Sequence, residues 1–164
     1  MRNIKQFLIF TTCLLLILTT CVGCNKYPNE PFNGEVEFGD ITITIPDTYI
    51  RDTTVQGYKE GVAKRWERDN YKSIVTISRH EKYELTDETM QQIVYNQQTQ
   101  MAEGTVQAEK ITFFDTVALQ TTFEIEDEQE MKYLIFSDNE YTYEFSVQGD
   151  ISDYETIKSS IRGN

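Results

Sequence analysis

Gly39-Asp40-Ile41-Thr42-Ile43-Thr44-Ile45-Pro46-Asp47 carries the clearest strand pattern of this chain. Its three isoleucines alternate with two threonines, and a period of two places all three isoleucines on one face of a β-strand. Val36 and Phe38 precede it, and the Gly39-Asp40 dipeptide suits a tight hairpin turn. Pro46 ends the strand. The stretch therefore predicts an antiparallel hairpin with one buried face.

Further short strands are predicted on both sides of one long helix. Residues 62–67 and 71–78 alternate around an Asp69-Asn70 turn, whereas the polar residues 50–61 indicate a loop or an irregular edge. Trp66 shares a strand face with Lys64 and Arg68, a mixture that indicates an edge or a groove. After the helix, four strands follow in succession, at residues 105–113, 117–125, 131–136 and 141–147.

Two of these later strands carry a distinctive pattern. Residues 131–136 are apolar on both faces, so we expect a central strand that is covered from both sides. In residues 141–147, four large side chains share one face: Tyr141, Tyr143, Phe145 and Val147. The sheet therefore has at least one strongly apolar face.

Two helices are predicted from apolar residues spaced close to 3.6 apart. The first is capped by Thr86 or Asp87 and stopped by Gly104, and its apolar stripe is Met90, Ile93, Val94 and Met101. Its other face is rich in amides that could bind a ligand or simply be solvated: Gln91, Gln92, Asn96, Gln98 and Thr99. The second helix begins after Ser152 or Asp153 and carries Tyr154, Ile157 and Ile161 on one face.

This order of elements predicts an α+β domain, an antiparallel β-sheet with a central helix and a C-terminal helix packed on it. The pattern from Gly39 to Tyr49, the central helix, the segment Tyr143 to Gly149 and the helix from Tyr154 to Ile161 together resemble the PsbP-like fold. That fold is an αβα sandwich found in photosystem accessory subunits and many small bacterial lipoproteins. The resemblance covers about residues 36–162 and implies a non-enzymatic accessory or binding protein.

The first 23 residues have the pattern of an export signal. Arg2 and Lys5 precede an apolar run from Phe7 to Leu18, which is too short for a membrane-spanning helix of about 20 residues. Val22-Gly23-Cys24 then resembles the lipobox of bacterial lipoproteins, in which the cysteine is lipidated with acyl chains such as palmitate. Cys21, preceded by Leu18-Thr19-Thr20, is the competing lipidation site, and a plain secretory signal is a third interpretation.

Cysteine usage and length set the expected organisation. Cysteine occurs at positions 13, 21 and 24 and nowhere later, so the folded region has no disulfide and depends on an ordinary buried core. We expect residues 1–23 to be a lipoprotein signal peptide, 24–35 a tether, and 36–164 a single PsbP-like α+β domain. The acyl chains would hold this domain at the extracytoplasmic side of the cell membrane.

The charge of the chain excludes one class of partner. The chain contains 15 Lys and Arg and 27 Asp and Glu, and only two basic residues and no acidic ones lie in the first 23 positions. The remainder therefore carries 13 basic and 27 acidic residues, a net charge of −14. Nucleic-acid binding needs a basic stripe, and the sequence has none. Anionic lipid head groups should also repel the domain.

No catalytic or metal-binding motif is recognisable. His80 is the single histidine, and a Ser-His-acid triad would need a serine and a carboxylate beside its ring. Zinc is disfavoured because cysteine is absent after Cys24. One acidic run could gather a divalent cation but lacks the spacing of a calcium loop: Glu124, Glu126, Asp127, Glu128 and Glu130. We expect no catalytic residue, metal or cofactor.

Tyrosines are the remaining candidates for a site. Tyr133, Tyr141, Tyr143 and Tyr154 could line a binding cleft, since tyrosine combines contact area with a polar tip, or they could simply pack in the core. We therefore expect a lipid-anchored extracytoplasmic accessory or binding protein, attached to the membrane by its N-terminal lipid, with an envelope protein or a small molecule as its partner. The alternative is a cell-surface hydrolase that uses acidic residues or His80.

Overall fold

The computed structural model describes residues 34–54, 57, 61–100, 104–125 and 129–164. The predicted signal peptide, the lipidation site Cys24 and most of the tether lie outside these residues. In chain order, the elements over the described ranges are β1 (Gly34–Phe38), β2 (Ile41–Ile45), β3 (Ile50–Asp52), β4 (Ala63–Arg68), β5 (Ser73–Glu81), α2 (Asp87–Gln100), β6 (Thr105–Phe113), β7 (Thr116–Ile125), β8 (Gln129–Ser137), β9 (Tyr141–Gly149), α3 (Tyr154–Ser160) and β10 (Arg162–Gly163).

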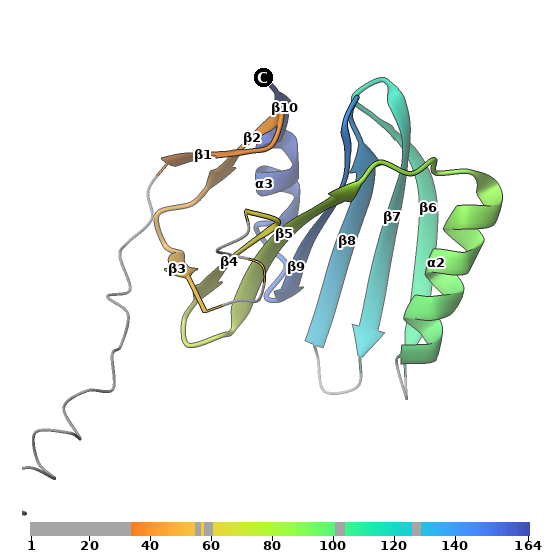
Figure 1. Cartoon of the computed structure of the whole chain (residues 1–164). Coiled ribbons are helices and arrows are strands. Elements are labelled where there is room, and N and C mark those ends of the chain that lie inside the picture. The colour runs from red at the N-terminus through yellow and green to blue at the C-terminus, as the bar shows by residue number, and fades with distance from the viewer. Residues whose placement is uncertain (1–33, 55–56, 58–60, 101–103, 126–128) are drawn as a thin grey trace, which may run out of the picture.

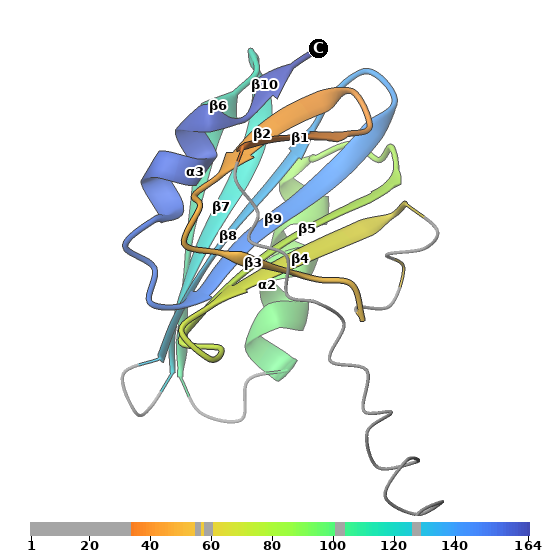
Figure 2. The ribbon, with the colours of Figure 1, turned by 90° about the vertical axis from the view of Figure 1, so that its left-hand side faces the viewer.

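The strands form two antiparallel sheets. The larger has seven strands in the order β3-β4-β5-β9-β8-β7-β6, and the smaller has three in the order β1-β2-β10. The small sheet and α3 cover one face of the large sheet, and α2 lies on the opposite face (Figures 1 and 2). The result is a layered α+β sandwich, and the predicted fold class is confirmed.

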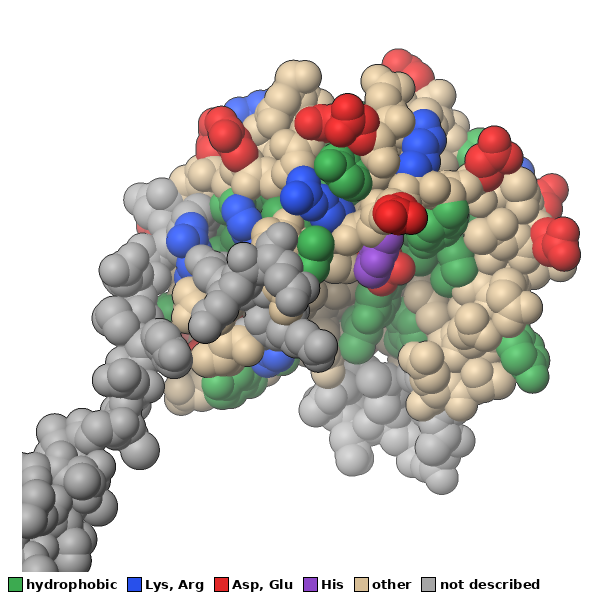
Figure 3. Space-filling model, in the orientation of Figure 1, with side chains coloured by type: hydrophobic (Ala, Val, Ile, Leu, Met, Phe, Trp, Pro, Cys, Tyr) green, Lys and Arg blue, Asp and Glu red, His purple; other side chains and the backbone are tan. Residues whose placement is uncertain are grey.

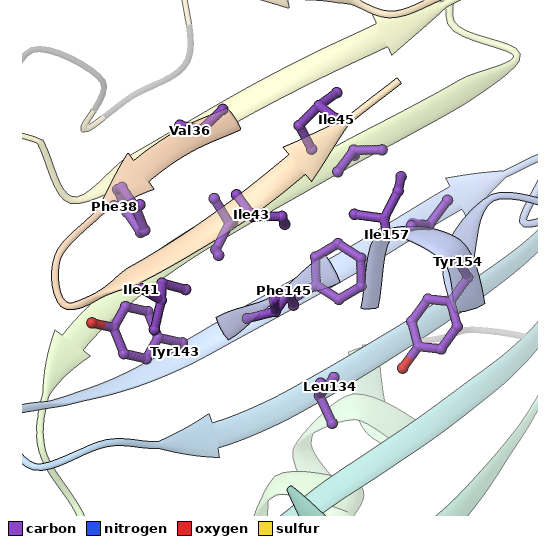
Figure 4. Packing of buried hydrophobic residues seen from close by; sticks show 14 of the residues in the cluster. Val36, Phe38, Ile41, Ile43, Ile45, Leu134, Tyr143, Phe145, Tyr154 and Ile157 are labelled. Carbon is purple, nitrogen blue, oxygen red and sulfur yellow. The ribbon is translucent and has the colours of Figure 1, made fainter. Parts of the chain in front are cut away.

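The main core lies between the two sheets and α3. Ile41, Ile43 and Ile45 are fully buried or nearly so, as the alternating stretch predicts, and they pack with Phe145 and Ile157 (Figure 4). Truncating one such isoleucine to alanine costs about 2–5 kcal/mol. The β1–β2 hairpin therefore covers the main core.

A second, smaller cluster lies under α2. It consists of Met90 from the helix with Leu119 of β7 and Ile135 of β8. Strand β8 contributes Leu134 to the main core and Ile135 to this cluster, so it is covered from both sides, as its apolar sequence predicts.

The start of the large sheet differs in detail from the prediction. Residues 50–61 are predicted to form a loop or an irregular edge, and within them Ile50–Asp52 forms the short edge strand β3, paired with Arg65 to Glu67 of β4. The following hairpin is shifted from residues 62–67 and 71–78 to Ala63–Arg68 and Ser73–Glu81. Its turn is longer than expected because Asp69, Asn70 and Tyr71 all adopt positive φ. Three consecutive left-handed residues keep the chain out of the sheet until Ser73.

The mixed face of β4 divides into a buried centre and two charged ends. Trp66 is fully buried in the main core. Lys64 donates to the carbonyl of Glu37 at 2.8 Å, and its ammonium lies over the Phe38 ring. Arg68 forms ion pairs with Asp150, at 2.7 Å, and with Asp153. The two charged side chains therefore lie at the margins of the main core, Lys64 against the small sheet and Arg68 against the start of α3.

Asp153 is the N-cap residue of α3, but its side chain makes no capping hydrogen bond. Its carboxylate instead accepts a hydrogen bond from Tyr49 and pairs with Arg68. The capping position was predicted correctly, and the long-range partners of this carboxylate explain why it does not cap.

Candidate functional site: a groove between helix α2 and strand β6

Helix α2 forms because its first turn is well capped. The Thr86 hydroxyl accepts the backbone N–H of Thr89 at 3.2 Å, and Asp87 and Glu88 place negative charge at the positive end of the helix dipole. Along the helix, Gln92 donates to Asn96 at 2.8 Å. These local interactions support the helix, in addition to its contacts with the sheet below.

Packing of α2 on the sheet is shallow. Met90 is the only buried residue of the helix, and Ile93 and Val94 are half-buried against the small cluster. Space therefore remains along both flanks of the helix, where it passes over the sheet.

The larger space lies on the flank next to β6, and we call it the α2–β6 groove. Its volume is about 590 Å³, within the range of small-molecule and peptide sites. Its lining residues are Asp87, Met90, Gln91, Val94, Tyr95 and Gln98 of α2, Ala108 and Lys110 of β6, and Leu119 of β7.

The chemistry of the α2–β6 groove changes along its length. Met90, Val94 and Leu119 supply apolar surface in the middle. Asp87 and Lys110 form an ion pair across the groove at 2.8 Å, close to the N-terminal end of α2. The amide of Gln98 lies near the C-terminal end of the helix. An apolar centre between polar ends suits an extended ligand.

Tyr95 is the most exposed large apolar side chain of this region. It is 64% exposed although it lines the groove. In Figure 3, apolar side chains reach the surface among charged ones on the half of the molecule that carries α2. An exposed aromatic beside an apolar groove is typical of a contact surface.

The other flank of α2 carries a smaller space, the α2–β9 groove, with a volume of about 340 Å³. Its lining is more polar and consists of Ile93, Asn96, Gln97 and Gln100 of α2, Phe123 of β7, Met131, Tyr133 and Ile135 of β8, and Glu144 of β9. Burial and the Glu144 carboxylate raise the pKa of Tyr133, and a hydrogen bond with Ser146 opposes them. Tyr133 is therefore a neutral hydrogen-bonding group at physiological pH.

The amide face predicted for the helix divides between these two grooves. Gln91 and Gln98 line the α2–β6 groove, and Asn96 lines the α2–β9 groove. Gln98 also has a structural role, because it donates to the carbonyl of Gly104 at 3.1 Å and accepts the N–H of Val106 at 3.2 Å.

The four candidate tyrosines do not form one cleft, so that interpretation of them is wrong. Tyr143 and Tyr154 are fully buried in the main core, where their rings stack on Phe136 and Phe145 (Figure 4). Tyr133 lies on the opposite face of the sheet. It pairs with Ser146 and points the same way as that residue, and Ser146 points away from its neighbours Phe145 and Val147, which are part of the main core.

Tyr141 is half-buried at the edge of the main core. The Arg79 guanidinium lies over its ring at 4.7 Å. Core packing therefore accounts for Tyr141, Tyr143 and Tyr154, and Tyr133 alone reaches a groove.

His80 does lie beside a serine and a carboxylate. Its Nε2 atom is 3.4 Å from the Ser78 hydroxyl and 3.6 Å from Glu144 Oε1. Strand alternation places Ser78 and His80 on one face, and Glu144 pairs with Ser78 in register. Both partners lie at the same ring nitrogen, whereas a proton relay needs the serine at one nitrogen and the acid at the other. This geometry does not support a triad.

The acidic run is divided between two strands. Glu124 and Glu130 pair across β7 and β8, and Glu126, Asp127 and Glu128 lie outside the described residues. Over the described part of the chain, no cluster of three or more His, Cys, Asp or Glu side chains could hold a metal ion.

Sequence reasoning missed four of the nine residues that line the α2–β6 groove. Tyr95, Ala108, Lys110 and Leu119 were not singled out, because a groove between two elements has no local signature. One signal was available: Tyr95 is an aromatic residue on the polar side of an amphipathic helix.

Comparison with known proteins supports the fold. The chain is similar to cyanobacterial PsbP (CyanoP) from Synechocystis sp. PCC 6803, whose solution structure superimposes with a TM-score of 0.54 at 15% sequence identity, covering 76% of this chain and 87% of that one. No protein-family model matches the sequence. No curated protein matches it either.

The fold is thus PsbP-like, in agreement with the resemblance in the sequence. Neither described helix is long and apolar enough to span a membrane.

Proposed function

We propose that this protein is a lipid-anchored, extracytoplasmic accessory or binding module that has no chemistry of its own. The α2–β6 groove is the single observation that carries the binding role. It combines about 590 Å³ of space, an apolar centre and an exposed aromatic on a helix that is shallowly packed. The PsbP-like fold is consistent with this proposal, and His80 lacks the arrangement that hydrolysis by a triad would need.

The membrane attachment rests on the sequence pattern that ends at Cys24. A lipid anchor suits this acidic domain, because anionic head groups repel its surface and leave the acyl chains as the attachment. Mass spectrometry of the protein from isolated membranes should find acyl chains on Cys24. The variant Cys24→Ala should lose them and leave the membrane, whereas Cys21→Ala should retain them. Acylation that survives Cys24→Ala would contradict this assignment.

The binding role is tested by affinity capture with two matched variants. Tyr95 and Tyr71 are both exposed, at 64% and 59%, but only Tyr95 lines the groove. Full-length protein carrying Tyr95→Ala should capture its partner from solubilised membranes at least fivefold less than the unmodified protein, as measured by quantitative mass spectrometry. Tyr71→Ala should capture it normally. Equal capture by both variants would remove the groove from the proposal.

A further inference from the structure

Strand β6 is a long, open edge of the large sheet. It has nine residues and pairs with β7 on one side, and over the described ranges no strand pairs with its other side. Most of its side chains are exposed. The opposite edge of the sheet, β3, has only three residues. A long edge without proline is a template for pairing with another chain.

The direction of its free backbone groups follows from one hydrogen bond. The N–H of Val106 donates to the side chain of Gln98 and so points away from β7. In an antiparallel ladder this direction alternates, so the N–H and C=O groups of Ala108, Lys110 and Thr112 also point outward. None of these groups has a hydrogen-bond partner among the residues that the structure describes.

Gln98 shows how an added strand would bind. Its side-chain amide donates to the carbonyl of Gly104 and accepts the N–H of Val106, at 3.1 and 3.2 Å. One residue of a parallel neighbouring strand makes the same pair of contacts. The start of the edge is therefore already occupied by an amide from α2, and the next outward groups are the carbonyl of Val106 and the N–H and C=O groups of Ala108.

The open edge and the α2–β6 groove are adjacent. Ala108 and Lys110 belong to β6, and their side chains line the groove. A strand added to β6 would point alternate side chains toward α2, over the apolar surface of Val94 and Leu119. The backbone would then supply affinity, and the groove would select alternate apolar side chains.

We propose that the β6 edge and the α2–β6 groove together bind an extended segment of a partner protein, apolar at alternate positions and basic between them. This inference rests on the proposed function as a binding module. Basic residues are expected between the apolar ones because those positions point to the face of the sheet away from α2, where the exposed carboxylate of Glu109 lies on β6. On the groove side, Lys110 and Asp87 already pair with each other. The net charge of the domain adds to this preference.

A second copy of this chain is a poorer occupant. Full antiparallel overlap of two β6 strands centres on Glu109, which places Glu109 of one copy directly opposite Glu109 of the other. Like charges directly opposite one another destabilise a strand pair. A basic segment removes this repulsion.

The test uses the full-length protein and a fluorescent nine-residue peptide in which isoleucine alternates with lysine. We expect saturable binding, and amide hydrogen exchange should slow at Ala108, Lys110 and Thr112. The same peptide with alternate backbone nitrogens methylated should bind at least tenfold more weakly, because it has lost the N–H groups that pair with the edge. This comparison uses unmodified protein, so it does not depend on the folding of any variant.

Two protein variants sharpen the result. Ala108→Pro removes an outward N–H without touching the bonds to β7, so it should weaken binding at least tenfold. Gln107→Ala changes a side chain on the other face and should change affinity less than twofold. Equal binding of the two peptides, no saturable binding, or protection elsewhere than β6 would overturn the inference. Loss of partner capture in Tyr95→Ala would still support the binding module in each of those cases.

Discussion

At the residue scale, the buried tyrosines hold distant segments together through their hydroxyl groups. Tyr143 donates to Asp138 at 2.8 Å and accepts the N–H of Asp40 at 3.1 Å, which connects β9 to the turn between β1 and β2. Tyr154 donates to Gln120 of β7 at 3.2 Å. A buried hydroxyl is tolerated in an apolar core only when it is hydrogen-bonded in this way.

Removing one of these hydroxyls should measurably destabilise the protein. Tyr143→Phe leaves the N–H of Asp40 without its partner, and we expect the free energy of unfolding in urea to fall by about 1–3 kcal/mol. Tyr95→Phe is the control, since that side chain is exposed, and its effect should be below about 0.5 kcal/mol. A Tyr143→Phe variant as stable as the unmodified protein would show that the hydroxyl contributes nothing.

Stability should also fall at alkaline pH. Burial, with a smaller contribution from the Glu144 carboxylate, raises the pKa of Tyr83 to about 12, and burial raises the pKa of Tyr143 and Tyr154. In the unfolded chain these groups lose their protons near pH 10. Because the unfolded state then binds fewer protons than the folded state, stability is full below pH 10 and is lost as pH rises toward 12.

Urea unfolding at pH 8, 10 and 11.5 measures this dependence. Tyr83→Phe should reduce the loss of stability between pH 10 and 11.5, because one of the groups with a raised pKa is gone. A stability that stays constant over this range would contradict the burial of these hydroxyls.

At the scale of single elements, the strands differ in how far the sequence determines them. Alternation was sufficient for β2, whose three isoleucines are buried as expected, and for Thr105–Phe113, where the predicted and observed limits agree. It predicted no regular strand at β3, because Ile50 is the only apolar residue of its three and a single apolar residue gives no periodicity. It also failed for β10, a two-residue strand specified only by its neighbour β2.

The end of β9 is a backbone position that only glycine fits. Gly149 has a φ of +86°, and a β-carbon there would lie 2.1 Å from the carbonyl oxygen of Lys72. Gly149→Ala should therefore cost more than the about 1–3 kcal/mol of backbone strain alone, and we expect a large loss of melting temperature. Gly163→Ala, where no atom lies within 4 Å, is the control and should melt normally. Equal melting temperatures would contradict this account of the β5–β9 junction.

The candidate site also belongs to the scale of elements, since it is a gap between α2 and β6. The amide face of the helix was visible in the sequence, and Gln91, Asn96 and Gln98 do line grooves. Which strand lies beside each flank depends on the sheet order, in which β6 is the outermost strand. Local periodicity carries no information about that order, so Lys110 and Leu119 could not be identified in advance.

At the scale of the whole molecule, the two faces of the large sheet have different roles. The face toward β1, β2 and α3 is a closed core built on Ile41, Ile43 and Phe145. The face toward α2 is only partly closed and carries both grooves. A rigid core behind an open face is a suitable scaffold for binding, because the contact surface can vary without loss of the fold.

Site-specific photo-crosslinking tests most directly whether the α2–β6 groove is the binding surface. A photoreactive amino acid would replace Tyr95 or, as the control, Tyr71 in the full-length chain, and intact cells producing it would be irradiated. We predict one discrete covalent adduct from position 95 and none of that mass from position 71. The same adducts from both positions, or none from position 95 with the protein correctly localised, would contradict the account.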